Sequence, residues 1–315
     1  MGQLSFASLT RKTKAISTAT FLGEMDAVIP WKKLTHLIQP YYYDGKTGRK
    51  PMSLELMLRI YFLQQWFNLG DPTVEESIYD RISFQRFLKI DLMLDLIPDE
   101  TTILKFRHLL EEQDLTRQIL DTVNKCLEQK GVLLKQGTIV DATLIIAPSS
   151  TKNNDKKRDP EMSSTRKNGS WHFGMKVHIG TDAKSGLIHS LAVTTAKVTD
   201  KDMLFELLHG KEEAIFADKG YVSQKDKKLA REAAIYWGVL DKAGAGKKLS
   251  GKQKKRNRQL SSVRSKVEHP FQVIKHLWKH TKTRYRGIKK NCAQFFTLAA
   301  LHNLYRVRKH PVLMG

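Results

Sequence analysis

Two aspartates lie within or directly after apolar runs, where a carboxylate is costly to bury unless something compensates its charge. Asp141 is in the middle of the β-branched run 138–147, and Asp218 directly follows the run 214–217. An ordinary turn or capping role is the alternative for both, and it fits Asp218 better than the mid-strand Asp141. A bound metal ion is a compensation that suits either aspartate.

A third acidic residue, Glu268, stands alone in a cationic region. From position 242 to 315 the chain has twenty lysine and arginine residues and no other acid. Arg264 and Lys275 fall on the same side of the predicted helix as Glu268, and the alternative reading is an ordinary i,i+4 ion pair with Arg264. Pro270 is expected to kink this helix or to begin its second half, because it removes a backbone donor.

Carboxylates from two strands and a helix would form a site of oxygen ligands, which suits Mg²⁺ or Mn²⁺. We expect Asp141, Asp218 and Glu268 to be both metal ligands and catalytic residues, holding two ions. Such a pair of ions promotes in-line displacement at phosphorus without a protein nucleophile. The chemistry that this pattern predicts is therefore metal-dependent phosphoryl transfer.

The elements that must position these acids form an α/β domain, predicted over residues 137–315. The strand that holds Asp141 is followed by a polar loop, 148–170, and by a hairpin whose strands are 171–181 and 186–195. The remaining segments alternate between helix and strand and include a basic linker: helix 200–209, strand 213–217, helix 223–233, strand 234–240, linker 242–258, and helices 259–282 and 291–308.

Residues 1–136 are predicted to form an all-helical N-terminal domain. Apolar residues recur at helical spacing after Pro51, and again over 73–88 and 99–130, where Gly131 is a plausible C-terminal glycine. Short helices joined by tight turns fit a helix-turn-helix DNA reader, and they fit a packed helical bundle equally well.

The charge is unevenly distributed. The chain of 315 residues carries a formal charge of +22, of which residues 1–137 contribute only +1. This excess is typical of a protein that binds a polyanion, with an anionic membrane or a basic tail as the alternatives. The expected DNA contacts are Lys152, Lys156, Lys157, Arg158, Lys254, Lys255, Arg256, Arg258, Arg264, Lys275, Arg284 and Arg286.

Trp171 alternates with Phe173 on one strand face. Ordinary packing is the first interpretation of this tryptophan, and stacking on a displaced base is the second.

The apolar pattern and the cysteine count indicate the compartment. The sequence has no run of 18 or more uncharged apolar residues and only two cysteines, so we expect no membrane partner and a cytoplasmic, nucleoid-associated protein.

Together these residues resemble the DDE transposases of bacterial insertion sequences, in the insertion-sequence-five group. The resemblance covers nearly the whole chain and rests on segments 55–67, 98–107, 139–143, 171–176, 217–221 and 267–271. It implies an RNase H-like catalytic domain whose triad falls on Asp141, Asp218 and Glu268. The signature around the glutamate is Tyr, two residues, Arg, three residues, Glu, six residues, Lys. Arg264, Glu268 and Lys275 fit it, and Ser261 stands at the tyrosine position.

The resemblance also implies a reaction and its partners. We expect a transposase that exposes 3′-hydroxyls at the ends of its element and joins them to target DNA. Its partners would be duplex DNA, as terminal inverted repeats and target, and further copies of itself in a homodimer or a larger synaptic oligomer. The alternatives are an RNase H-like nuclease that cuts without joining and a non-catalytic DNA-binding regulator. The intact triad disfavours the regulator.

Overall fold

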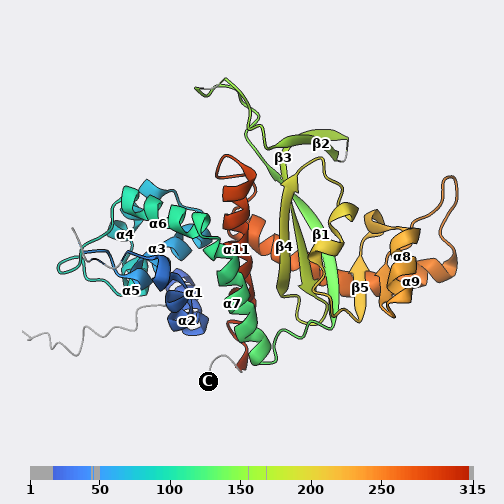
Figure 1. The fold of residues 1–315 in the computed structure, drawn as a ribbon, viewed down its shortest axis with the longest axis horizontal. Helices are drawn as coiled ribbons and strands as arrows, with labels where there is room; N and C mark the ends of the chain where they lie inside the picture. Colours follow the sequence, from blue (N-terminus) through green and yellow to red (C-terminus); the bar gives the residue numbers. More distant parts are fainter. Residues whose placement is uncertain (1–16, 44, 46–49, 155, 168, 312–315) are drawn as a thin grey trace, which may run out of the picture.

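The computed structural model describes residues 17–43, 45, 50–154, 156–167 and 169–311. Residues 1–16 of the predicted N-terminal domain lie outside this part. Figure 1 shows helices at one side of the molecule, a sheet at the other, and a long helix between them. The N-terminal helices are α1 (Ser17–Val28), α2 (Trp31–Ile38), α3 (Leu54–Phe67), α4 (Asp71–Asp80), α5 (Ile82–Leu88), α6 (Glu100–Glu112) and α7 (Leu115–Gln129).

The predicted helical segments are present, but two of them are divided. The segment 73–88 is broken at Arg81 into α4 and α5, and 99–130 is broken where Asp114 adopts a left-handed backbone with φ 49°. Asp99 caps α6 by accepting a hydrogen bond from the Thr102 amide. Gly131 follows α7 with φ 68°, as its predicted terminal role requires.

A six-stranded mixed sheet follows the helices. Its strands are β1 (Gly137–Ile146), β2 (Ser163–Lys167), β3 (Ser170–Asp182), β4 (Ile188–Thr195), β5 (Ala214–Ala217) and β6 (Tyr236–Val239). β3 pairs antiparallel with β1, β2 and β4, whereas β5 pairs parallel with both β1 and β6. This mixed α/β architecture behind a helical N-terminal part confirms the predicted fold class.

Two sequence predictions in the sheet region were wrong. The polar loop 148–170 contains β2, which has no buried apolar side to reveal it and is held by its pairing with β3. The predicted helix 200–209 is instead two short 3₁₀ turns, Lys201–Met203 and Phe205–Leu207. Segment 223–233 does contain a helix, α8 (Gln224–Glu232).

The predicted basic linker 242–258 must also be corrected, because its second half is helical. Helix α9 (Gly251–Arg264) begins with a capping box in which the Ser250 hydroxyl and the Gln253 side chain bind each other's backbone amides. Its lysines, arginines and glutamines favour a helix without forming an apolar stripe, so periodicity did not reveal it.

The segment after α9 departs from regular α-helix, as Pro270 led us to expect. A 3₁₀ turn (Ser265–Val267) leads into α10 (Glu268–Phe271), and a π-helix (Gln272–Leu277) follows. The last helix, α11 (Ile288–Val307), contacts α7 on one side and β4 on the other. One apolar core therefore extends from Leu22 in α1 through the sheet to Val307 in α11.

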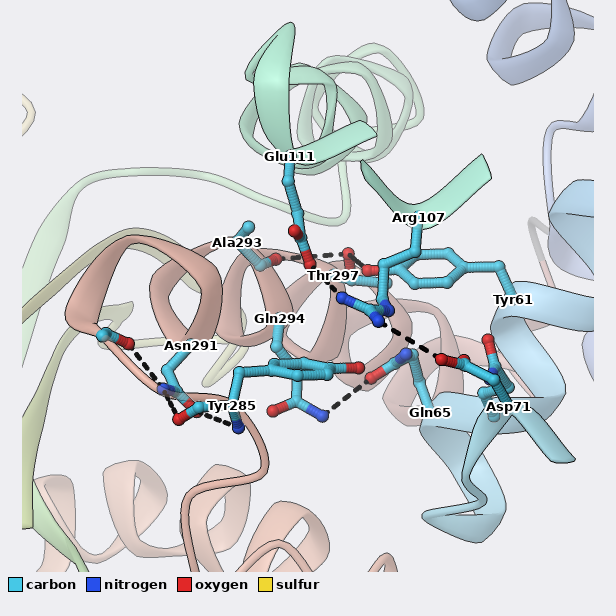
Figure 2. A network of polar contacts seen from close by, with 12 residues as sticks. Tyr61, Gln65, Asp71, Arg107, Glu111, Tyr285, Asn291, Ala293, Gln294 and Thr297 are labelled. Atoms are coloured by element: carbon cyan, nitrogen blue, oxygen red, sulfur yellow. Dashed lines mark hydrogen bonds and ion pairs between the residues drawn. The ribbon is translucent and has the colours of Figure 1, made fainter. Parts of the chain in front are cut away.

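Polar contacts also join α11 to the N-terminal helices (Figure 2). The Gln294 amide donates to Gln65 over 3.2 Å, and Thr297 lies 3.1 Å from the Tyr61 hydroxyl. Beside them Arg107 binds Glu111 at 2.9 Å and packs over the ring of Tyr285. No helix in the described part of the chain is long and apolar enough to cross a membrane.

Candidate active site

Asp141 projects from the middle of β1, as its sequence position predicts. Its side chain is 18% exposed, and its Oδ1 accepts a hydrogen bond from the Ala142 amide at 2.8 Å. Burial raises the pKa of this carboxyl, an effect that Arg264 and the Ala142 amide oppose and that the charge of Asp218 increases. The strand thus holds a carboxylate that needs a cation nearby.

Arg264 supplies a cation to two of the three predicted acids. Its Nη2 lies 3.1 Å from Asp141 Oδ2, and its Nη1 lies 3.4 Å from Glu268 Oε1. The guanidinium sits at the end of α9, from which it reaches both the sheet and the start of α10. Asp141 and Glu268, 127 positions apart in the chain, therefore lie on either side of one side chain.

Asp218 directly follows β5, the strand that pairs with β1. β1 and β5 run parallel with Ile139 opposite Phe216, and each aspartate follows two residues later. The Asp218 Oδ1 accepts from the Gly220 amide at 2.7 Å, which starts the 3₁₀ turn Lys219–Tyr221. Asp218 therefore has the capping role that was the alternative reading, and it also lies close enough to Asp141 to affect its pKa.

Residues 133–304, more than half of the chain, match the family model described as the transposase DDE domain. Residues 11–109 match a second model, described as a transposase domain. The chain belongs to the DDE transposase family. This match confirms the predicted family, enzyme class and function: the protein is a DNA transposase, which cleaves DNA and transfers strands. Membership implies DNA binding and dependence on a divalent metal. Nothing in either match favours a nuclease or a non-catalytic regulator.

The donor chemistry of this transposase fits a divalent metal, although its acids are not gathered around one point. Among the described residues, no group of three or more His, Cys, Asp or Glu side chains is placed to hold a metal ion. The Arg264 guanidinium lies between Asp141 and Glu268, and Glu268 is 52% exposed. The position between these two carboxylates is therefore one that attracts positive charge.

Lys275 extends the polar side of the transposase site along β1. Its Nζ binds the Thr143 hydroxyl at 3.0 Å and the Leu144 carbonyl at 3.1 Å, and burial lowers its pKa. Thr143 is two residues from Asp141, so both point to the same face of the sheet. Lys275 thus attaches the π-helix to the strand that holds Asp141.

The cations predicted to contact DNA divide into two groups. Three use their guanidinium groups within the fold: Arg158 donates to Ser149 O, Arg284 to Asn68, and Arg256 to the carbonyls of Trp237 and Val239 at the end of β6. The others outside the acidic site are exposed, namely Lys152, Lys156, Lys157, Lys254, Lys255, Arg258 and Arg286. Trp171 is also exposed, at 71%, where β3 pairs with β2.

Tyr221 and Asp200 are neighbours of the site that sequence reasoning did not select. Tyr221 is 1% exposed, and its hydroxyl is buried without a hydrogen-bond partner. Burial raises the pKa of this phenol, and the charges of Asp200, Asp141 and Asp218 raise it further. Asp200 forms an ion pair with Lys176 at 2.9 Å. The segments 171–176 and 217–221 contain Lys176 and Tyr221, but nothing in their spacing indicated that both lie near Asp200.

Proposed function

We propose that Asp141, Asp218 and Glu268 are the catalytic triad of this transposase and hold its divalent metal, as two Mg²⁺ or Mn²⁺ ions. The observation that carries the proposal is the contact of one guanidinium, from Arg264, with both Asp141 and Glu268. For Asp218 the support is its position directly after β5, the strand beside β1, and the effect of its charge on the pKa of Asp141. When bound, such ions activate an attacking oxygen and stabilise the leaving oxygen of a phosphodiester.

The chain's own residues have separate roles in this proposal. Asp141 is held rigidly by β1 and the Ala142 amide, and Asp218 is oriented by the Gly220 amide. Lys275 fixes the segment after Glu268 against β1. The exposed cations of α9, Lys254, Lys255 and Arg258, bind DNA phosphates beside this site, and exposed Trp171 stacks on a displaced base.

The remaining proposals concern organisation. Residues 1–136 recognise the terminal repeats of the element and residues 137–315 perform catalysis, within the insertion-sequence-five group. The protein works on the bacterial nucleoid as a homodimer or a larger synaptic oligomer, because two element ends must be joined to one target. ATP is not needed, since each transesterification exchanges one phosphodiester for another.

The test is strand transfer from a labelled duplex that carries the terminal repeat, incubated with the protein, Mg²⁺ and plasmid DNA. We expect labelled strands joined to the plasmid. Cleaved strands without joined product would indicate the nuclease instead.

The same assay tests the triad through Asp141→Asn and Asp218→Asn. Each change should abolish cleavage and leave binding to the repeat largely intact, because a lost metal ligand removes several kcal/mol of transition-state stabilisation and about 1.4 kcal/mol is tenfold in rate. Either variant retaining more than about a tenth of wild-type cleavage would contradict the assignment.

A further inference from the structure

Helix α11 buries a second group of polar side chains, away from the network of Figure 2. His302 and Asn303 are both 0% exposed, and Asn124 of α7, which faces them, is 4% exposed. Polar groups at this depth are costly unless each finds a partner. Their hydrogen bonds form a continuous series that ends beside Glu268.

This series of hydrogen bonds runs from α10 to α7. His269, the residue after Glu268, places its Nδ1 3.3 Å from His302 Nε2, and His302 Nδ1 lies 3.4 Å from Asn303 Oδ1. The Asn303 amide nitrogen donates to Asn124 Oδ1 at 2.8 Å and to the Ile188 carbonyl at 2.7 Å. The Ile188 amide donates back to Asn303 Oδ1 at 2.8 Å.

The donors and acceptors of this series can be assigned from one end. The Ile188 backbone fixes the orientation of the Asn303 side-chain amide. The Ile188 N–H needs the Asn303 oxygen as its acceptor, and the Ile188 carbonyl needs the Asn303 nitrogen as its donor. Burial lowers the pKa of His302 to about 3, so its ring is neutral and has a single N–H. That N–H is on Nδ1, facing the Asn303 oxygen, and Nε2 must then accept from Nδ1–H of His269.

The helix around Glu268 is irregular, so a side-chain hydrogen bond from this segment to a neighbouring element helps to fix its position. α10 is a single turn between a 3₁₀ turn and a π-helix, and Pro270 lacks the donor that a regular helix would use. The Glu268 amide donates to the Ser265 carbonyl and its carbonyl accepts from the Gln272 amide, so Glu268 is bonded within a short segment that changes helix type on both sides. A side-chain hydrogen bond from the adjacent residue, His269, ties this segment to α11.

We propose that His302 and Asn303 are positioning residues that fix α10, and with it Glu268, against β4 and the N-terminal helix α7. The inference rests on the proposed catalytic role of Glu268. It gives α11 a function beyond packing: the placement of the triad glutamate depends on a helix of the N-terminal part. Displacement of a reacting group by about 1 Å costs up to about 100-fold in rate, so a small shift of α10 is sufficient to be measured.

The test compares three substitutions in α11 of the full-length protein, namely His302→Leu, His302→Gln and the control Thr297→Val. His302→Leu breaks the series of hydrogen bonds between His269 and Asn303, whereas His302→Gln keeps an acceptor for His269. Thr297→Val is the matched control, because Thr297 is also 0% exposed and bonded to an N-terminal helix residue, Tyr61, but has no link to α10. Single-turnover cleavage at saturating DNA and Mg²⁺ is measured with binding to the repeat and unfolding by urea.

We expect His302→Leu to slow cleavage by about 10- to 100-fold with repeat binding within about threefold of wild type. His302→Gln should recover most of the rate, and Thr297→Val should cleave normally after a similar loss of stability. Equal losses of rate in His302→Leu and Thr297→Val, or normal cleavage by His302→Leu, would overturn the proposal. Glu268→Gln, assayed in parallel, separates the two proposals: if it cleaves normally, the triad assignment itself fails.

A measurement on the wild-type protein covers the case in which His302→Leu does not fold. Nitrogen-15 NMR of labelled histidine rings distinguishes the two neutral tautomers. We expect His269 and His302 each to carry hydrogen on Nδ1. A His269 ring protonated on Nε2 alone would contradict the proposed hydrogen bond from His269 to His302.

Discussion

The Arg264 guanidinium lies 3.1 Å from the Asp141 carboxylate, one residue of α9 against one residue of the central strand β1. The same group is 3.4 Å from Glu268. A protein cation thus balances the charge of two acids that are proposed to hold a metal. We expect a divalent ion at the same carboxylates to compete with Arg264, so that the guanidinium turns away when the ion binds.

Replacement of Arg264 by glutamine tests this competition. In EDTA the free energy of unfolding should fall by about 1.5 to 3 kcal/mol, the usual contribution of a hydrogen bond to a charged group. Added Mn²⁺ should then raise the melting temperature more in Arg264→Gln than in wild type, because no guanidinium has to be displaced. Arg256→Gln is the control, since Arg256 pairs with Asp241 away from the triad. Equal Mn²⁺ responses in all three proteins would refute the competition.

Glu268→Gln separates a metal ligand from an ordinary surface ion pair. We expect the variant to lose cleavage in Mg²⁺ and to bind the repeat in EDTA at least as tightly as wild type, because a carboxylate close to the scissile phosphate repels it. If Glu268 only pairs with Arg264, the change costs about 0 to 1 kcal/mol of stability and turnover persists. Single-turnover cleavage and metal-free binding of the same preparation decide between the two.

The salt dependence of DNA binding should depend on α9. The triple change of Lys254, Lys255 and Arg258 to alanine removes three exposed cations and should reduce the slope of log affinity against log salt by roughly 3, at about 0.9 per phosphate. The matched control changes three exposed lysines of the N-terminal helices, Lys32, Lys105 and Lys125. A larger reduction in the control would place the DNA on the other part of the protein.

Buried histidines make folding sensitive to mild acid. Burial lowers the pKa of His178 and His280 to about 4 and that of His189 and His302 to about 3, whereas unfolded histidine has a pKa near 6.5. Between these values the unfolded chain binds more protons, so stability is present above about pH 6.5 and decreases as the pH falls.

The expected loss at pH 5 is up to about 2 kcal/mol for each of these histidines. Urea unfolding between pH 7.5 and 5 measures it. His178→Asn should reduce the slope by up to one proton, because it removes one of these buried rings. A flat profile in wild type would show that these rings are not buried as neutral groups.

The segments that position the proposed triad, β1, β5 and the helical segment around Glu268, were predictable because their signals are local. A charged residue inside an apolar run indicated Asp141, and a lone acid among cations indicated Glu268. The first half of α9 and the strand β2 were missed for the opposite reason: α9 has no apolar stripe and β2 has no buried face. The sequence also could not show that Arg256 binds backbone carbonyls while Lys254 remains exposed, because a count of charges does not distinguish the two.

The periodicity of the sequence could not predict contacts between distant segments. The sequence suggested a helical domain and a catalytic domain in series, whereas α11 packs against both in one core. The bonds from His302 to His269 and from Asn303 to Asn124 join residues 33 and 179 positions apart. Nothing in the spacing of these residues indicates that they meet.

The position of α11 between the N-terminal helices and the sheet has a consequence for dividing the protein into fragments. A polypeptide without residues 288–307 would leave exposed the apolar sides of α7 and β4 that α11 covers. We therefore expect a fragment without this helix to unfold or aggregate, so that a stable catalytic fragment must retain α11 together with the helices it contacts.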